Sequence, residues 1–145
     1  MKLAVDSSSF AKRYVQEIGS EDLERFLGEA SELAFSVILV PEIISALNKR
    51  LREHILTIGD YRAVKKQLMA DVSDATALQI TPSVISRSVK LLENNALRTL
   101  DSLHVACALE WRADLLITSD RRQFTAAKNS GLRVEYIGQP VVGEK

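Results

Sequence analysis

Cysteine, excess charge and long apolar runs are all scarce in this chain. Its 145 residues include one cysteine, Cys107, and its 19 basic side chains balance 19 acidic ones. A lone cysteine has no intramolecular partner, which is typical of a reducing cytoplasm, and we expect Cys107 to be a small core residue. Balanced charge produces no global field that attracts polyanions, so any contact with nucleic acid requires a local basic patch.

Membrane and secretion signals are also missing from the sequence. No apolar run approaches the roughly 20 residues that a membrane-spanning helix needs, and Met1–Asp6 is too short and too soon acidic for a signal peptide. We therefore expect a cytoplasmic protein without a membrane span. There is no repeat, linker or low-complexity segment, and the length is that of one domain. We expect this domain at residues 1–138 and a flexible tail at 139–145.

Strand and helix patterns alternate along the whole length. Short apolar runs predict strands at Lys2–Val5, Leu33–Val37, Ala77–Ile80, Asp114–Thr118 and Leu132–Tyr136. Apolar residues at helical spacing predict helices near residues 7–16, 20–27, 41–52, 60–71, 82–92, 100–111 and around Phe124. Ser20, Thr99 and Ser119 are expected to cap the helices that follow them. This alternation predicts an α/β fold in which a mostly parallel sheet carries helices on both faces.

Four acidic residues lie where one predicted element gives way to the next. Asp6 and Asp120 follow two of the strands, Glu42 follows an apolar run that ends in Pro41, and Asp101 opens a helix. The carboxyl ends of parallel strands line one crevice, where crowded carboxylates repel each other unless a cation compensates them. Hard oxygen ligands suit Mg²⁺ or Mn²⁺. The four residues are therefore interpreted as a metal cage.

Each carboxylate alone has a simpler explanation. Acidic residues at helix starts are favoured by the helix dipole, which would account for Asp6, Glu42 and Asp120 without any metal. Asp101 is harder to explain in this way, because it shares a helix face with Val105 and looks buried. Aspartate is almost never fully buried without a partner. The common position of all four at one sheet edge favours the cage.

Four segments around these acids carry a resemblance to one family: Leu3-Ala4-Val5-Asp6-Ser7-Ser8, Val40-Pro41-Glu42, Arg98-Thr99-Leu100-Asp101-Ser102-Leu103-His104-Val105-Ala106 and Leu116-Ile117-Thr118-Ser119-Asp120. The chain is similar, from Lys2 to about Ile137, to PIN-domain ribonucleases of the VapC toxin type, whose fold is a three-layer α/β/α sandwich. The resemblance implies metal-dependent endonucleolytic cleavage of RNA, with Asp6, Asp101 and Asp120 as ligands of Mg²⁺ or Mn²⁺. Glu42 is expected to act through water or to orient the nucleophile.

The same resemblance implies partners. A toxin of this type pairs with a small VapB-like antitoxin, whose arginine would replace the metal between the carboxylates, since its fork binds carboxylates bidentately. A homodimer is also expected, because the predicted helix from Asp60 to Asp71 carries more apolar residues than one small sheet covers.

Neighbouring polar residues suggest supporting roles. Ser8 and Ser119 are candidates to hold a ligand carboxylate or a metal-bound water, although ordinary helix capping explains both equally well. His104, three residues after Asp101, is either catalytic or a partly buried residue that packs under the site. The basic residues closest in sequence to the acids are candidate RNA contacts, although such residues are usually solvated faces: Lys12, Arg13, Arg98, Arg121 and Arg122.

Other functions agree less well with the residues. A phosphatase of the haloacid-dehalogenase type needs a second acid two residues after the first, where this chain has Ser8. A nucleotide-binding protein needs a glycine-rich turn after the first strand, where Ser7-Ser8-Ser9 stands instead. A catalytically idle PIN fold that binds RNA or protein remains the alternative, and retention of all four carboxylates argues against it.

Overall fold

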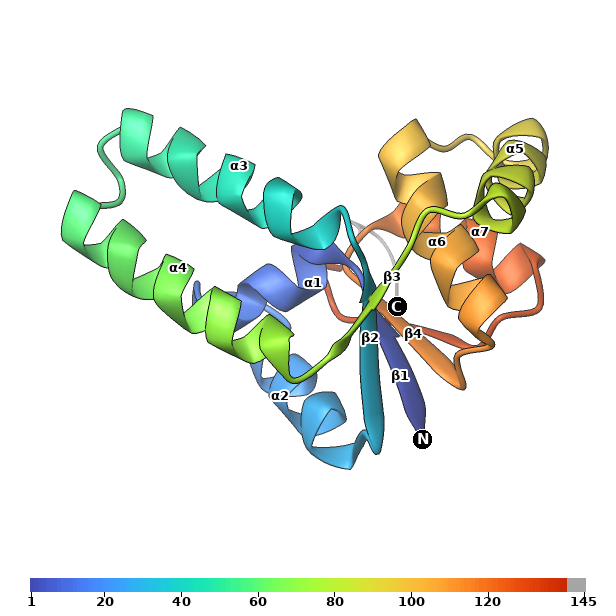
Figure 1. Cartoon of the computed structure of the whole chain (residues 1–145), viewed down its shortest axis with the longest axis horizontal. Coiled ribbons are helices and arrows are strands. Elements are labelled where there is room, and N and C mark those ends of the chain that lie inside the picture. Colours follow the sequence, from blue (N-terminus) through green and yellow to red (C-terminus); the bar gives the residue numbers. More distant parts are fainter. Residues whose placement is uncertain (141–145) are drawn as a thin grey trace.

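The computed structural model describes residues 1–140, which form a three-layer α/β/α sandwich (Figure 1). Its five strands form one parallel sheet in the order β3-β2-β1-β4-β5. The strands are β1 (Lys2–Val5), β2 (Glu32–Ser36), β3 (Thr76–Leu78), β4 (Leu115–Thr118) and β5 (Val134–Tyr136). The α/β class, the parallel sheet and the helices on both faces are therefore confirmed.

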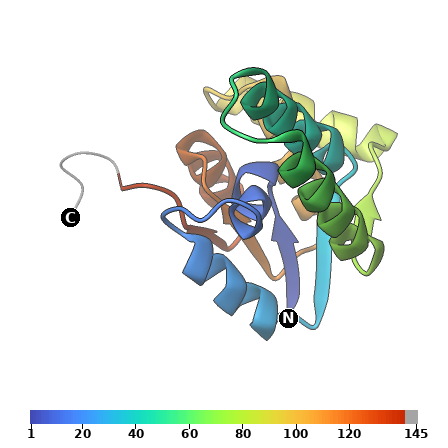
Figure 2. The same ribbon diagram turned by 90° about the vertical axis from the view of Figure 1, so that its left-hand side faces the viewer.

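Seven α-helices and one short 3-10 helix cover the sheet within the described residues. They are α1 (Ser7–Phe10), the 3-10 helix η1 (Ala11–Arg13), α2 (Ser20–Glu29), α3 (Leu39–Arg52), α4 (Ile58–Ser73), α5 (Pro82–Asn94), α6 (Thr99–Trp111) and α7 (Arg121–Asn129). The chain crosses the sheet so that α1 to α4 lie on one face and α5 to α7 on the other (Figures 1 and 2). None of these helices is long and apolar enough to span a membrane.

The two faces of the central strands build two cores. Alternate side chains point to opposite faces of a strand, so Leu3 and Val5 of β1 pack with α1 to α4, while Ala4 packs with α5 to α7. β4 repeats the pattern with Ile117 on the first face and Leu116 on the second. Because both faces of β1 and β4 are buried, these strands are continuous apolar runs. Cys107 lies in the second core, as expected, and burial raises the pKa of its thiol.

Local details at four helix ends differ from the predictions. The first helix stops at Phe10 and continues as η1 instead of reaching residue 16. Gly19, not Ser20, is the N-cap of α2, and the Ser20 hydroxyl instead donates to the Lys12 carbonyl at 2.9 Å. Gly19 has φ of +99°, and a Cβ there would lie 1.8 Å from the Ile137 carbonyl oxygen, so only glycine suits this position.

The caps of α6 and α7 are each shifted by one residue from the prediction. Arg98 precedes α6, and neither it nor Thr99 makes a side-chain cap. Asp120 is the N-cap of α7, where its carboxylate accepts from the Gln123 backbone N–H. Of the predicted flexible tail at 139–145, only residues 139 and 140 fall inside the described part of the chain, so the domain boundary stays a prediction.

Candidate active site

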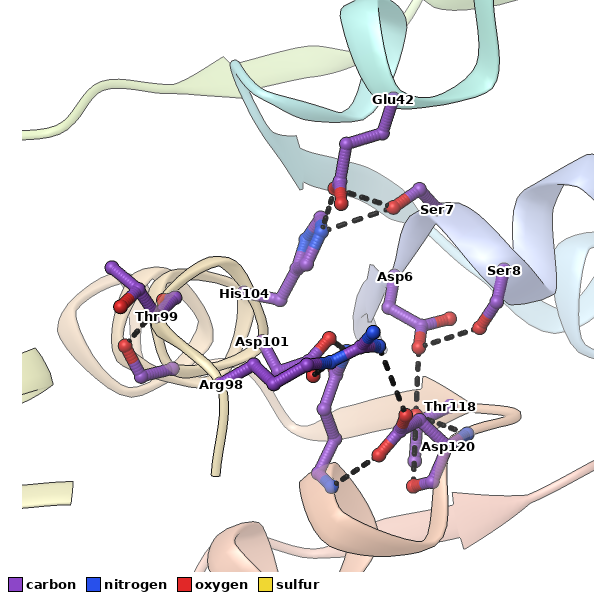
Figure 3. A network of polar contacts seen from close by, with 12 residues as sticks. Asp6, Ser7, Ser8, Glu42, Arg98, Thr99, Asp101, His104, Thr118 and Asp120 are labelled. Carbon is purple, nitrogen blue, oxygen red and sulfur yellow. Dashed lines mark hydrogen bonds and ion pairs between the residues drawn. The ribbon is translucent and has the colours of Figure 1, made fainter. Parts of the chain in front are cut away.

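The four acidic residues lie around the carboxyl ends of the central strands (Figure 3). Asp6 follows β1 and caps α1, and Asp120 follows β4 and caps α7. Glu42 and Asp101 stand in the first turns of α3 and α6, on opposite faces of the sheet. Asp6 is fully buried and Asp101 is 5% exposed, so both carboxylates require partners that replace water.

Uncharged donors surround the Asp6 carboxylate. Its Oδ2 accepts from the hydroxyls of Thr118 at 2.7 Å and Ser8 at 3.0 Å, and its Oδ1 accepts from the Ser9 backbone N–H at 2.9 Å. Ser9 also bonds to Ser119 through their hydroxyls, which ties α1 to the end of β4. These bonds fix the orientation of a carboxylate that makes no ion pair with a side chain of residues 1–140.

A cation instead holds the other two aspartates. Arg98 Nε donates to Asp101 Oδ2 at 2.9 Å, and its Nη2 lies 3.8 Å from Asp120 Oδ2. The hydrogen bond and the charge of Asp101 raise the pKa of Arg98 above its ordinary value. Gln123 contacts the same two acids, because its side-chain Nε2 donates to Asp101 at 3.0 Å and its backbone N–H donates to Asp120 at 2.9 Å.

Hydrogen bonds join these two halves into one site. The Thr118 hydroxyl that donates to Asp6 also accepts from the Asp120 backbone N–H at 3.0 Å. Asp6 is thus linked through Thr118 to Asp120, which shares Arg98 and Gln123 with Asp101. The three aspartates face a common space in Figure 3, with the Arg98 side chain between Asp101 and Asp120.

Glu42 belongs to a separate cluster at the rim of this space. Its Oε1 contacts the Ser7 hydroxyl at 2.7 Å and His104 Nε2 at 2.5 Å, and these two partners lie 3.0 Å apart. Burial by itself raises the pKa of Glu42, but the hydrogen bonds from His104 and Ser7 outweigh it, so the pKa lies below its ordinary value. Glu42 is therefore ionised at neutral pH and held in one orientation.

Comparisons with known proteins agree with this geometry. The PIN domain family model matches residues 3–129, and Ribonuclease VapC45 of Mycobacterium tuberculosis is 30% identical over 132 residues, which are 89% of this chain and 91% of the relative. The chain belongs to the PIN-domain family and is of the VapC type.

Solved structures with the PIN fold are similar despite low identity. FitAcB from Neisseria gonorrhoeae superposes with a TM-score of 0.71 at 14% identity, over 91% of this chain and 95% of that one. A toxin–antitoxin complex from Klebsiella pneumoniae gives a TM-score of 0.65 at 18% identity, over 84% and 89%. At such identities the likeness concerns the fold alone.

The acidic residues of this PIN domain suit a divalent cation in their chemistry, although the site as it stands is closed by Arg98. Within residues 1–140, no group of three or more His, Cys, Asp or Glu side chains is arranged ready to hold a metal ion. The facing donors are nevertheless hard oxygens, and Gln123 Oε1, buried beside Asp101, accepts no hydrogen bond from this part of the chain. Asp6, Asp101 and Asp120 are the residues that could hold a metal once Arg98, whose side chain is 71% exposed, moves aside.

The candidate RNA-binding cations lie in different surroundings. Lys12 is 7% exposed and pairs with Glu17 at 3.0 Å, which gives no support to its predicted contact with RNA. Arg13 pairs with Glu24 and Asp71, away from the acidic site. The predicted Arg13 contact is left without support by this position.

The other three candidates lie around the acidic site. Arg98 pairs with the site's own acids. Arg121 lies over the ring of Tyr136, 3.7 Å from its centroid, and Arg122 is exposed. Arg98, Arg121 and Arg122 line one hollow together with Asp120. These three therefore stay in the set of candidate RNA contacts.

Two residues that hold the acidic side chains in place, Gln123 and Ser7, were not predicted from the sequence. Gln123 stands three residues after the cap Asp120, a spacing typical of a capping box, which could have drawn attention to it. Its side chain turns to Asp101 instead of back to its own helix. Ser7 bonds to Glu42, which follows a different strand 35 residues later, and no local pattern reveals that contact.

Proposed function

We propose that this PIN-domain protein is a metal-dependent endoribonuclease and the toxin of a toxin–antitoxin pair. The convergence of Asp6, Asp101 and Asp120 on one space, with the exposed side chain of Arg98 between Asp101 and Asp120, is the observation that carries the proposal. The name of the relative Ribonuclease VapC45 supports RNA as the substrate.

The roles of the residues follow from their positions. Asp6, Asp101 and Asp120 would hold Mg²⁺ or Mn²⁺, and a bound ion would stabilise charge on the attacking and leaving oxygens of the phosphodiester. Glu42, which Ser7 and His104 hold ionised and in one orientation at the rim, would bind the metal through water or orient the attacking water. Ser8 and Thr118 keep Asp6 in a fixed orientation, and Ser119 supports it through Ser9.

Cleavage in the presence and absence of metal tests this proposal. The purified protein is incubated with a panel of structured RNAs in EDTA, and Mg²⁺ or Mn²⁺ is then added back in excess. We expect internal cuts only when the divalent ion is present. RNA that binds but stays intact with both metals would instead favour the catalytically idle PIN fold.

The toxin role implies a protein partner and an assembly. A toxin–antitoxin complex is among the structures with this fold, which supports a VapB-like antitoxin that blocks the acidic site in the cytoplasm. Ile58 and Met69 of α4 are 52% and 48% exposed, which supports the expected homodimer. Expression alone should arrest growth, and co-expression of the antitoxin should restore it, while light scattering reports the oligomeric state. Harmless expression of the folded protein would contradict the toxin role.

A further inference from the structure

Three hollows lie in a row on the face formed by α5, α6 and α7. The first, of about 330 Å³, begins at the acidic site and is lined by Arg98, Asp120, Arg121 and Arg122. The second, of about 250 Å³, is lined by Asn95, Ala96, Arg121, Arg122 and Thr125. The third, of about 420 Å³, lies between α5 and the end of α7 and is lined by Arg87, Lys90, Leu91, Asn94, Asn95, Leu109, Asn129 and Ser130.

Shared residues show that these hollows are neighbours. Arg121 and Arg122 line both the first and the second, and Asn95 lines both the second and the third. Together the hollows extend from Asp120, at the acidic site, to Lys90 on α5. We call this series of hollows the α5–α7 groove.

Basic side chains line the groove at both of its ends. Lys90 and Arg122 are exposed and make no ion pair within the described part of the chain. Arg87 stands at the far end, paired with Glu110 at 2.5 Å. Asp120 is the one carboxylate among the lining residues of the three hollows, and it belongs to the acidic site. In a protein without net charge, this is a local surface suited to a polyanion.

Amide groups complete the lining. Asn94 and Asn129 donate through their side-chain nitrogens to the Lys90 carbonyl at 2.8 Å and to the Asn95 side-chain oxygen at 3.0 Å. Their own oxygens are thereby left to accept bonds from a ligand. Phosphate contacts by cations position a strand, while acceptors of this kind contact amino groups of bases. None of the described residues that line the groove is aromatic, so ionic contacts are expected to dominate its affinity.

We propose that the α5–α7 groove holds single-stranded RNA next to the active site, with Arg122 and Lys90 as phosphate contacts. This inference rests on the proposed ribonuclease function and adds the course of the substrate. An unpaired strand suits the groove because its bases are free to reach the asparagine oxygens, whereas an RNA duplex is bound mainly through shape across its minor groove.

Binding measured without cleavage tests the groove. Fluorescence anisotropy follows a labelled single-stranded RNA of about 12 nucleotides in EDTA, over a series of salt concentrations, and a gel confirms that the RNA stays intact. Lys90→Gln and Arg122→Gln should each weaken binding about threefold or more and reduce the slope of log affinity against log salt by about 0.7. Lys66→Gln is the matched control, since Lys66 is an exposed lysine on α4, across the sheet, and should change neither quantity.

Two results separate this inference from the proposed function. Unchanged affinity and salt slope in the Lys90→Gln Arg122→Gln double variant would overturn the groove, even if the wild type cuts RNA. A groove-dependent loss of binding would support it, even if no metal restores cleavage, in which case the ribonuclease proposal fails. Equal binding of a duplex of the same sequence, with the same loss in both variants, would overturn the single-strand assignment.

Discussion

The two halves of the acidic site hold their carboxylates in different ways. Asp6 is fixed by two hydroxyls and a backbone N–H, all uncharged and all from neighbouring segments of the fold. Asp101 and Asp120 instead share the guanidinium of Arg98, whose side chain is 71% exposed. The first arrangement is built into the fold and stays whether or not a cation is present. The second depends on one exposed side chain, that of Arg98.

This difference indicates how the site would accept a metal. An incoming divalent cation would leave the bonds from Thr118, Ser8 and Ser9 to Asp6 unchanged. It would replace the positive charge that Arg98 provides to Asp101 and Asp120. Arg98 is the exposed partner of these pairs, so water can solvate it when it turns away, while the metal supplies positive charge to the buried Asp101. The Asp6 half is therefore the rigid part of the site and the Arg98 half its adjustable part. The predictions below separate these two roles.

Loss of a ligand carboxylate in either half should have the largest effect. Asp6→Asn and Asp101→Asn should each lower metal-dependent RNA cleavage by more than about 100-fold, beyond the range of residues that only orient ligands. Cooperative thermal unfolding should persist, because the amide keeps the shape of the carboxylate. Asp74→Asn, an exposed acid after α4, is the control and should cleave normally. Full activity in both site variants would refute the catalytic assignment.

Removal of the Thr118 hydroxyl, which donates to Asp6, should have the next largest effect on metal binding and activity. Thr118→Val keeps the side-chain shape but deletes the donor to Asp6 and the acceptor for the Asp120 backbone N–H. We expect about a 10- to 100-fold loss of metal affinity or activity and about 1–3 kcal/mol of lost stability. Calorimetry and chemical denaturation measure the two quantities. Thr76→Val, at an exposed position of β3, is the control and should change neither quantity. Unchanged metal affinity and stability in Thr118→Val would contradict the role of this hydroxyl in holding Asp6.

Removal of Arg98 should act in the opposite direction on metal binding. Arg98→Gln deletes the competing cation, so Mn²⁺ affinity should rise, by up to about fivefold if the ion pairs contribute 0–1 kcal/mol. Isothermal titration in the absence of RNA measures it. Arg25→Gln is a close control, because Arg25 also pairs with an aspartate three residues away on a helix. A weaker Mn²⁺ affinity in Arg98→Gln would mean that Arg98 supports the metal site instead of competing for it.

The smallest expected effect is on folding stability, when Glu42 at the rim is substituted. Its folded-state pKa is lowered from 4.5, so its contacts with His104 and Ser7 stabilise the fold above that pH and lose this contribution as pH falls through the lower folded value. The stability difference between wild type and Glu42→Gln should thus shrink as pH falls below 4.5. Denaturation at several pH values measures it. A difference that grows as pH falls below 4.5 would contradict the assigned direction.

Much of this architecture was predictable because it depends on local periodicity. The apolar runs of β1 and β4 indicated buried parallel strands, and Asp6 and Asp120 therefore had to emerge at the same sheet edge. The burial of Asp101 followed from the apolar face that it shares with Val105. These inferences need only the repeat of a strand or helix and the rule that parallel strands end together.

Contacts between distant segments were not predictable in the same way. The burial of Lys12 depends on how η1 packs, and a basic residue beside Asp6 in sequence looked like a phosphate contact. The bond of Gln123 to Asp101 joins α7 to α6, and the side-chain preference of an isolated capping box would have turned it elsewhere. The N-cap of α2 is set by the close approach of Ile137, which fixes glycine at position 19.

Crystals soaked with Mn²⁺ and measured at the manganese absorption edge test the central claim most directly. We predict an anomalous peak within coordination distance of Asp6, Asp101 and Asp120, with the Arg98 side chain turned out to solvent and the bonds of Thr118 and Ser8 to Asp6 unchanged. A site without manganese at saturating concentration, in which Arg98 still bridges Asp101 and Asp120, would contradict the account.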